Sequence, residues 1–530
     1  MSMSGGAGAL QAVDWRKYVG LYDGADATGI ASKIIADYSL DAALDTAIVA
    51  VLQVLYSQGA KAATPAIGVY VAPAFVKRSD AEEQQRHEKR AQVVTDVVAA
   101  AIAQGVLHDD SPLANLFNWD AYTARLANLR RAFPEPEFNH ALAVKSNPIR
   151  GVLLEAQRLG LGAECASFAE AKHSLSLGIP PRRVVYDSPC KTHQELKEMV
   201  QDGVFINLDN EEEIDKVNRI FAEIGGFSPD KHAAQIGLRV NPVVGGGSID
   251  ATSTATVTSK FGLAWTHETA DRLYKLYEAN PWLQGVHVHV GSQGCPIDLL
   301  VAGAQRAVEF AKEVNRRVGR QQVKAVDIGG GVPTVYDGGD QEAYDFQEYA
   351  DALHAKVPEL FTSGFTSIIT EFGRAIFVKP GITVSKVEAL KNWAGQNIAV
   401  VHVGADQFPR TAYLPKLWSH VISVLDHHGK IKPTSDKYVR QDVAGPLCFS
   451  GDFLAKQIFA PQAKIGDYMV IHDTGGYTVS MFSKFNSRQA APFIAYSKQS
   501  DGSFKFVTLK ERETIEETLA FWGINKPVQF

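Results

Sequence analysis

Apolar and polar positions alternate in a regular way between residues 140 and 373. Short apolar segments end in polar residues or in glycine-containing turns, and a helix-like segment follows each one. The apolar segments are HALAVKS (140–146), GAECAS (162–167), VVYDSP (184–189), VFINLDN (204–210), IGLRVNP (236–242), VHVHVGS (286–292), AVDIGGG (325–331) and SIITEFG (367–373). Eight strands that alternate with helices predict an α/β fold, a (β/α)8 barrel of the TIM type.

Capping signals support helices after the second and third strands. Ser167 with Glu170, and Thr192 with Glu195, have the spacing of a capping box, and Gly203 can end the second of these helices. We therefore expect each strand to be followed by a helix packed outside the barrel.

The first 110 residues predict a helical extension. A helix can run from a cap at Ser39 to a stop at Gly59. The charged stretch at 77–92 mixes both signs, which is typical of a solvated helix face, and it leads into an apolar helix that ends at Gly105. No residue pattern in this extension indicates chemistry.

Strand-like segments with turns replace the helical alternation after residue 395, for example NIAVVHVGA and GDYMVIHDTGGYT. They predict a second, mostly-β domain. A chain of 530 residues is also too long for one ordinary core. The expected organisation is a helical extension over 1–110, a barrel over 111–395 and a C-terminal β domain over 396–530.

Composition narrows the class of protein. A hydrophobic fraction of 45% and a charged fraction of 21% are those of a soluble globular protein, and a net charge of -6 argues against a nucleic-acid or anionic-membrane surface. The apolar run at 46–56 is too short to span a bilayer, and the N-terminus lacks the pattern of a signal peptide, so we expect a cytoplasmic protein. Disulfides or a zinc site are not expected, because no CxxC pair occurs among Cys165, Cys190, Cys295 and Cys448.

Polar groups stand at the carboxyl end of nearly every predicted strand. TIM-type barrels carry their chemistry at that end, and a purely structural barrel would not need such residues there. We therefore expect the active site at this end of the barrel. The residues are Lys145, Glu164, Asp187, Asn207, Arg239, His289, Asp327 and Glu371.

Three of these strand ends suggest one cofactor. A partly desolvated Lys145 is a good imine-forming amine. The glycines at 329–331 let backbone N–H groups approach a phosphate. Glu371 can hold a protonated ring nitrogen while nearby Arg374 holds an anion. Each feature alone is common, as a surface lysine or a tight turn, but together they specify pyridoxal 5'-phosphate.

Two histidines, His287 and His289, share one face of a strand. Histidines at this spacing can bind a metal, but no third ligand with convincing spacing follows them. We interpret His289 as a ring stacked against a flat cofactor, with Ser292 hydrogen-bonding beyond it, and His287 as a structural residue.

With these motifs the chain resembles the pyridoxal-phosphate-dependent decarboxylases of the alanine-racemase-like fold (fold type III), above all the diaminopimelate decarboxylases, with ornithine and arginine decarboxylases as relatives. The matching segments stand in family order from about residue 140 to 490. They are AVKSNP, GAECAS, LRVNP, SKFGL (259–263), HVHVGSQG, DIGGG, EFGR, GPLCFSGD and DTGGYTVSMFSKFNSR (473–488).

The resemblance implies a role for each matching residue. Lys145 would bind the cofactor covalently, His289 would stack on its ring and Glu371 would pair with its ring nitrogen. Cys448 would protonate the substrate carbon after carbon dioxide leaves, acting from the second subunit of a homodimer with shared active sites. Racemases of this fold lack the glutamate and the cysteine, so both residues favour decarboxylation of an amino acid. The implied cofactor-binding residues are Lys145, Glu164, Arg239, His289, Ser292, Gly329, Gly330, Gly331, Glu371, Gly373, Arg374 and Tyr477.

Several positions depart from the family pattern. Phe372 replaces a usual proline, and Phe485 replaces a usual tyrosine. Arg410 and Tyr413, which would contact the far carboxylate of the substrate, are three residues apart where the family has four. The implied substrate-binding residues are Arg374, Arg410, Tyr413, Phe449, Asp452 and Tyr477.

Phe449 is the departure with the largest chemical consequence. Diaminopimelate decarboxylases usually have a glutamate after the cysteine, where it meets the distal ammonium group of the substrate. A buried, unpaired ammonium costs several kcal/mol. Either another acid replaces the glutamate, with Asp452 the nearest, or the substrate lacks that amine; we hypothesise an altered distal pocket.

Three other functions remain open at this point. A true meso-diaminopimelate decarboxylase that makes L-lysine could recover the missing acid from the extension or from the partner subunit. A non-catalytic regulator would have lost Lys145 or Cys448, and both are present. A metal-dependent barrel enzyme would need clustered ligands that the sequence does not show.

Overall fold

The computed structural model describes residues 27–37, 48–49, 78–227, 235–339, 343–433 and 435–527. The helix predicted over 39–59 lies outside these residues, apart from 48 and 49. The chain forms two compact units, each built from separated parts of the sequence. The first contains Met1–Tyr70, Leu126–Thr334 and Glu342–Ala375, and the second contains Val71–Arg125, Val335–Gln341 and Ile376–Phe530. The boundaries at residues 110 and 395, drawn between consecutive domains, stay a prediction.

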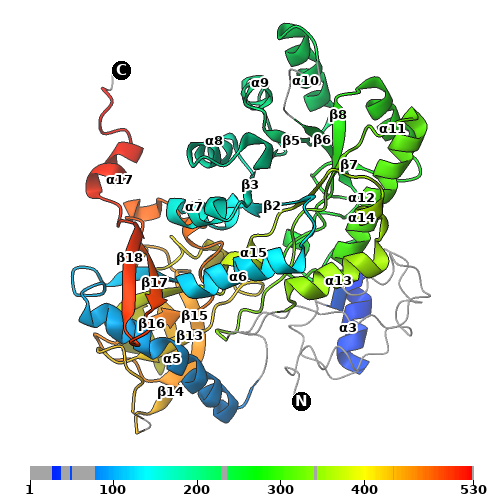
Figure 1. Cartoon of the computed structure of the whole chain (residues 1–530). Helices are drawn as coiled ribbons and strands as arrows, with labels where there is room; N and C mark the ends of the chain where they lie inside the picture. Colours follow the sequence, from blue (N-terminus) through cyan, green and yellow to red (C-terminus); the bar gives the residue numbers. More distant parts are fainter. Residues whose placement is uncertain are drawn as a thin grey trace. The chain divides into compact units, whose positions relative to one another are not determined.

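Eight parallel strands close a barrel in the first unit, which confirms the TIM-like fold (Figure 1). Each predicted strand is present, and β5 pairs with β6 while β10 pairs with β2 to complete the ring. A two-residue strand, β7 (Leu263–Ala264), pairs with β6 outside the ring order. The barrel strands are β2 (Phe138–Ala143), β3 (Gly162–Cys165), β4 (Val184–Asp187), β5 (Phe205–Leu208), β6 (Ile236–Asn241), β8 (Leu283–His287), β9 (Ala325–Asp327) and β10 (Ser367–Thr370).

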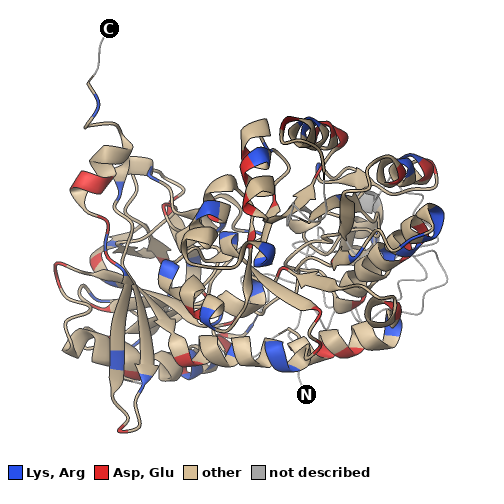
Figure 2. Ribbon diagram, turned by 45° about the horizontal axis from the view of Figure 1, so that its top comes forward, with Lys and Arg blue, Asp and Glu red and all other residues tan. Residues whose placement is uncertain are grey.

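Helices follow the barrel strands, and both basic and acidic residues occur along them (Figure 2). The Thr192 hydroxyl and the Glu195 side chain form the predicted capping box, and Gly203 ends that helix with a left-handed φ of 80°. Ser167 accepts from the Glu170 N–H, as its spacing predicts. The helices are α7 (Arg150–Arg158), α8 (Phe168–Ser176), α9 (His193–Asp202), α10 (Glu211–Glu223), α11 (Ala270–Ala279), α12 (Ile297–Val318), α13 (Phe346–Lys356) and α14 (Glu359–Thr362).

A large, mostly antiparallel sheet forms the second unit, which confirms a C-terminal β domain. Its strand order is β15-β14-β12-β11-β1-β17-β18, and β16 pairs with both β11 and β13. The strand β1, which precedes the barrel in the sequence, lies between β11 and β17. The strands are β1 (Leu113–Asn118), β11 (Gly381–Trp393), β12 (Gln396–Val401), β13 (Ile422–Leu425), β14 (Tyr438–Ala444), β15 (Phe453–Pro461), β16 (Tyr468–Ile471), β17 (Phe493–Lys498) and β18 (Phe504–Lys510).

The charged stretch at 77–92 begins a long helix, α5 (Asp80–Ala103), of the second unit. Its apolar half packs Val94 and Val98 into a cluster with residues of the sheet. The charged half is not solvated on all sides, because His87 is buried and its Nε2 accepts from the Val424 N–H at 2.9 Å. The extension therefore contributes a helix to the core of the β unit.

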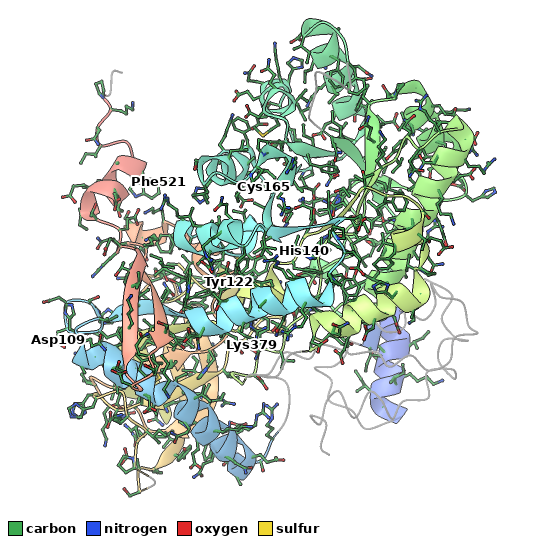
Figure 3. All side chains as sticks on the ribbon, viewed as in Figure 1. Asp109, Tyr122, His140, Cys165, Lys379 and Phe521 are labelled. Atoms are coloured by element: carbon green, nitrogen blue, oxygen red, sulfur yellow. The ribbon has the colours of Figure 1, made fainter. Side chains whose placement is uncertain are left out.

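A buried charge cluster fixes the loop 335–339 within the second unit. Lys379 is labelled in Figure 3. Its Nζ lies 3.0 Å from Asp337 Oδ1 and 3.3 Å from Asp473 Oδ1. The Gly338 N–H donates to Asp473 Oδ2 at 2.8 Å. This loop therefore belongs to the β unit although barrel residues flank it in the sequence. The described part of the chain contains no helix that is both long and apolar enough to cross a bilayer.

Candidate active site

Lys145 stands where the sequence predicts it, directly after β2 in the short 3-10 helix η3 (Val144–Ser146). Its Nζ lies 2.5 Å from Oε2 of Glu164 on the neighbouring strand β3. Burial raises the pKa of Glu164 to about 8, although the charge of Lys145 opposes that shift. The other oxygen of Glu164, Oε1, has no hydrogen-bond partner among the described residues. The lysine is thus held at the carboxyl end of the barrel by a fully buried acid.

Glu371 follows β10, and its side chain is 1% exposed. Its Oε2 lies 3.6 Å from His287 Nε2 and 3.4 Å from His289 Nδ1. Burial alone would raise the pKa of Glu371, but the two histidines lower it well below its usual range. Its Oε1 is buried and has no partner in the described part of the chain. Glu371 is therefore an ionised acceptor with one free oxygen.

His287, predicted to be a structural residue, lies between two buried carboxylates. Its Nδ1 lies 3.7 Å from Asp187 Oδ1, opposite the contact with Glu371. Burial alone would lower the pKa of His287, but Asp187 and Glu371 raise it to about 9. The sequence signal for this role was the shared strand face with His289. A protonated His287 keeps Glu371 ionised.

Arg239 extends this row of alternating charges. Its Nη1 donates a hydrogen bond to Asp187 Oδ2 at 3.0 Å. The ring of Phe261, from the SKFGL segment, lies 4.4 Å from the guanidinium group. Arg239, Asp187, His287 and Glu371 therefore form a buried chain of cation, anion, cation and anion, and Arg239 supports the site through Asp187.

Replacing His287 by asparagine tests this charge row through stability. The pKa of His287 rises from 6.5 to about 9 on folding, so its contribution is complete below pH 6.5 and is lost as the pH rises through about 9. Between pH 6.5 and about 9 we expect the free energy of unfolding of the cofactor-free wild type to fall by about 3 kcal/mol more than that of His287→Asn. This value follows from the size of the pKa shift. Urea unfolding at several pH values measures it. The exposed His267→Asn variant is the control, and equal slopes in His287→Asn and wild type would contradict the account.

His289 presents a neutral ring at the edge of the site. The Gly330 N–H donates to its Nδ1 at 3.2 Å, and burial lowers its pKa. Its side chain is 17% exposed, unlike the fully buried His287. A flat, neutral and partly accessible ring is compatible with the predicted stacking on a cofactor.

The glycine run 329–331 is required for packing between strand ends. Gly329 and Gly331 have φ values of +70° and +110°. A Cβ on Gly329 would lie 2.6 Å from the Val288 carbonyl oxygen, and one on Gly330 would clash with the Glu371 carbonyl oxygen. The neighbouring backbone, in addition to any ligand, therefore requires the glycines. The Gly331 N–H meets no acceptor among the described residues, so it is available to an anion.

Arg374 and Ser292 form a second pair of predicted phosphate-binding residues. The Nε and Nη2 of Arg374 donate to Ser292 Oγ at 3.2 and 3.1 Å. Arg374 is only 4% exposed and begins α15 (Arg374–Phe377). A Cβ on Gly373 would clash with Ser146 Oγ, which explains the glycine. Arg374 is thus a cation fixed by a hydroxyl at the helix start, a suitable place for a phosphate.

Phe372 is a packing residue next to the site. Its ring is 2% exposed and packs on Phe133, His140, Phe346 and Tyr349. The aromatic side chain therefore fixes the backbone between Glu371 and Gly373 from behind the site.

A metal site is the alternative use of these residues. His287, His289 and Glu371 each offer a ligand atom within 4.8 Å of the others. Glu371 is thus a possible third metal ligand beside the two histidines, which their spacing in the sequence did not indicate. Metal ligation requires a neutral imidazole. The raised pKa of His287 and the Gly330 N–H on His289 Nδ1 favour charge pairing over ligation.

The remaining predicted residues lie in the β unit. Cys448 is exposed, and its N–H donates to Asn486 Oδ1 at 2.8 Å. Asn486 has a left-handed φ of 56°, so the NSR segment (486–488) turns sharply to meet the cysteine loop. Phe449 stacks on Tyr413, with ring centroids 5.4 Å apart and an interplanar angle of 30°.

Asp452 holds the cysteine loop together. Its Oδ1 accepts from the Ala405 N–H at 2.6 Å, and its Oδ2 accepts from the Leu447 N–H at 2.7 Å. The residue is 3% exposed. Both oxygens are therefore used by the backbone, and the substrate contact predicted for Asp452 finds no support in this geometry.

Arg410 and Tyr477 come together in the same unit. Arg410 Nη2 donates to the Tyr477 carbonyl oxygen at 2.8 Å, and the guanidinium group lies 4.2 Å from the Trp418 ring. The predicted site residues thus form two groups. The barrel group is Lys145, Glu164, Arg239, His289, Ser292, Gly329, Gly330, Gly331, Glu371, Gly373 and Arg374, and the β-unit group is Arg410, Tyr413, Cys448, Phe449, Asp452 and Tyr477.

The barrel group fits pyridoxal phosphate. Lys145 supplies the amine, Glu371 Oε1 is a buried acceptor in need of a donor, and the Gly331 N–H and Arg374 can hold a phosphate. The family model of the pyridoxal-dependent decarboxylases, in its pyridoxal-binding domain, matches residues 120–378. The chain contains the pyridoxal-binding domain of a pyridoxal-dependent decarboxylase. It is an amino-acid carboxy-lyase, and its cofactor is pyridoxal 5'-phosphate.

Individual decarboxylases agree with this placement. The diaminopimelate decarboxylase of Aquifex aeolicus is 29% identical over 388 residues, which cover 73% of this chain and 86% of that protein. The Vibrio cholerae diaminopimelate decarboxylase is 29% identical over 422 residues, covering 78% and 94% of the two chains. The crystal structure of Helicobacter pylori diaminopimelate decarboxylase with L-lysine has the same fold, with a TM-score of 0.67, 23% identity and coverage of 80% and 99%. The decarboxylase region therefore spans most of the chain.

Proposed function

We propose that this decarboxylase acts on an α-amino acid whose far end lacks the second amine of diaminopimelate. The observation that carries the proposal concerns Phe449, the residue that follows Cys448. Its ring stacks on the ring of Tyr413. An aromatic face offers an ammonium group a cation–π contact but no carboxylate, so it replaces the usual glutamate only in part and is better suited to an apolar chain.

The nearest acid does not compensate for Phe449. Asp452 spends both oxygens on backbone N–H groups of its own loop. Releasing one of them for a substrate would leave a buried N–H without its partner, at a cost of about 1–3 kcal/mol. A distal ammonium group is therefore disfavoured on this side of the substrate.

Each chemical role falls to a residue in a suitable setting. Bound pyridoxal phosphate supplies the electron sink for the pair of electrons that carbon dioxide leaves behind. Lys145 would hold the cofactor through its side-chain amine, and ionised Glu371 would keep a proton on the ring nitrogen of the cofactor. Cys448 then gives its thiol proton to the substrate α-carbon.

Cys448 is proposed to act across a homodimer, with each active site shared by two subunits. Cys448 is exposed in the isolated chain, which agrees with a residue that acts in the active site of the other subunit. The dimer would also bury the exposed ring of Tyr413, which is 61% accessible.

Carbon dioxide release from a panel of amino acids tests the function. We expect the purified, cofactor-loaded enzyme to decarboxylate an amino acid with a carboxylate-bearing or less polar far end faster than it does meso-diaminopimelate. A panel in which meso-diaminopimelate is turned over as fast as any other amino acid would refute the altered pocket while leaving the decarboxylase activity in place.

A true meso-diaminopimelate decarboxylase, which forms L-lysine, is the second candidate. The names of the relatives favour it, since the Aquifex aeolicus and Vibrio cholerae proteins are both diaminopimelate decarboxylases. It requires an acid from elsewhere in the chain or the partner subunit to pair with the distal amine. The same assay distinguishes the two candidates.

A further inference from the structure

We propose that a cavity within the β unit, lined by none of the predicted site residues, binds a small organic anion with two or more negative charges. The cavity has a volume of about 590 Å³, within the range of small-molecule sites. Its walls come from the start of α5, from the segment 411–422 and from β15. We call it the α5 cavity.

The charge of the α5 cavity is strongly unbalanced. Glu83 is the acid among its described lining residues, and Arg440 already binds it at 2.8 Å. Arg86 lies 3.8 Å from Asp337, too far for a hydrogen bond. The cationic lining residues are Arg78, Arg86, Arg90, Lys416, Arg440 and Lys456.

Arg90 gives the most specific sign of a missing partner. Its Nε is buried and has no hydrogen-bond partner among the described residues, although it lines the cavity. Burial and then the charge of Arg86 lower the pKa of Arg90 to about 10. Burial and the same neighbour also lower the pKa of Arg78. The repulsion from Arg86 thus outweighs the attraction of Asp337 at both Arg78 and Arg90, and a bound anion would relieve this repulsion.

The segment 411–422 and β15 also give the cavity an apolar and aromatic lining. It includes Trp418, Phe453, Leu454 and Phe459. Phe459 also lies 5.0 Å from the Arg440 guanidinium group. A site lined by both guanidinium groups and aromatic rings suits an anion with a carbon skeleton, held by bidentate contacts through carboxylate or phosphate oxygens.

The cavity adjoins a helix of the β unit that carries two predicted substrate contacts. Thr411 and Ala412 line it from α16 (Pro409–Tyr413), the helix of Arg410 and Tyr413. Trp418, in the cavity wall, contacts the Arg410 guanidinium group at 4.2 Å. An anion bound there would thus contact the helix that also carries Arg410.

Calorimetric titration of the pyridoxal-phosphate-loaded enzyme tests the site, because the loaded enzyme has its own phosphate site filled. The probes are citrate and pyrophosphate, in buffer of constant ionic strength. We expect at least one of them to bind, and Arg86→Gln to weaken that binding by about tenfold, the loss of one charged hydrogen bond. Binding of citrate alone would assign a carboxylate ligand, and binding of pyrophosphate a phosphate-bearing one.

Lys505→Gln is the matched control, since Lys505 is an exposed cation on β18 outside the cavity. Lys416→Gln, in the segment 411–422, should also weaken binding, and it leaves the residues of α5 unchanged. Thermal unfolding of all three variants identifies any that fail to fold. The proposal fails if neither probe binds, or if Arg86→Gln, Lys416→Gln and Lys505→Gln bind equally well. Because binding is measured without a substrate, this failure would leave the proposed decarboxylation untouched.

Discussion

Lys145→Ala is expected to lower kcat/KM for decarboxylation on the order of 10⁴-fold, the size of effect seen when a covalent catalytic group is removed. The reason lies in the site geometry. Lys145 Nζ contacts the buried Glu164 at 2.5 Å, and the barrel group contains no other lysine that could supply an amine. The variant should also lose the visible absorbance that the protein-bound cofactor owes to its link with the lysine. Steady-state kinetics and an absorbance spectrum measure both effects.

Lys324→Ala provides the control for this experiment. Lys324 is exposed and immediately precedes β9, at the opposite end of a barrel strand from the site residues. Its removal deletes the same charge and should leave activity and spectrum unchanged. A Lys145→Ala variant that keeps both would contradict the assignment of the covalent lysine.

Cys448→Ala should lower kcat by about 10²- to 10⁴-fold, the usual contribution of a positioned proton donor. The cofactor spectrum should stay that of the wild type, because Cys448 lies in the β-unit group and Lys145 is intact. A loss of both activity and spectrum would instead mean that the loop held by Asp452 had collapsed. Cys190→Ala removes another exposed thiol and serves as the control.

Mixing the two inactive variants tests whether the site is shared between subunits. In a homodimer with shared sites, random exchange of Lys145→Ala and Cys448→Ala subunits makes half of the dimers mixed, each with one complete site. About a quarter of wild-type activity should then return. Recovery of no activity after confirmed subunit exchange would place Cys448 in the active site of its own subunit.

The barrel could be predicted from the sequence because its signals are local. Each strand is a short apolar run with a polar end, and capping residues such as Thr192 mark where the helices begin. The same regularity brings strand-end residues to one edge of the barrel, so the positions of Lys145, Glu164 and Glu371 in the sequence are enough to group them.

Contacts between distant segments could not be predicted in this way. Strand β1 joins the C-terminal sheet although it precedes the barrel, and α5 packs there because its apolar residues match an open face of that sheet. Asp452 looked like a substrate acid in the sequence, but its loop folds back so that backbone N–H groups take both oxygens. The charge of His287 depends on Asp187, which lies a hundred residues away in the chain.

The distal pocket is tested most directly by two substrates that differ only in the distal amine. These are meso-diaminopimelate and 2-aminopimelate, which has the same chain and both carboxylates. With Phe449 beside Cys448, we expect kcat/KM for 2-aminopimelate to exceed that for meso-diaminopimelate by about tenfold to a hundredfold, the cost of an ammonium group without an acceptor. A higher kcat/KM for meso-diaminopimelate would contradict this account and show that another acid binds the distal amine.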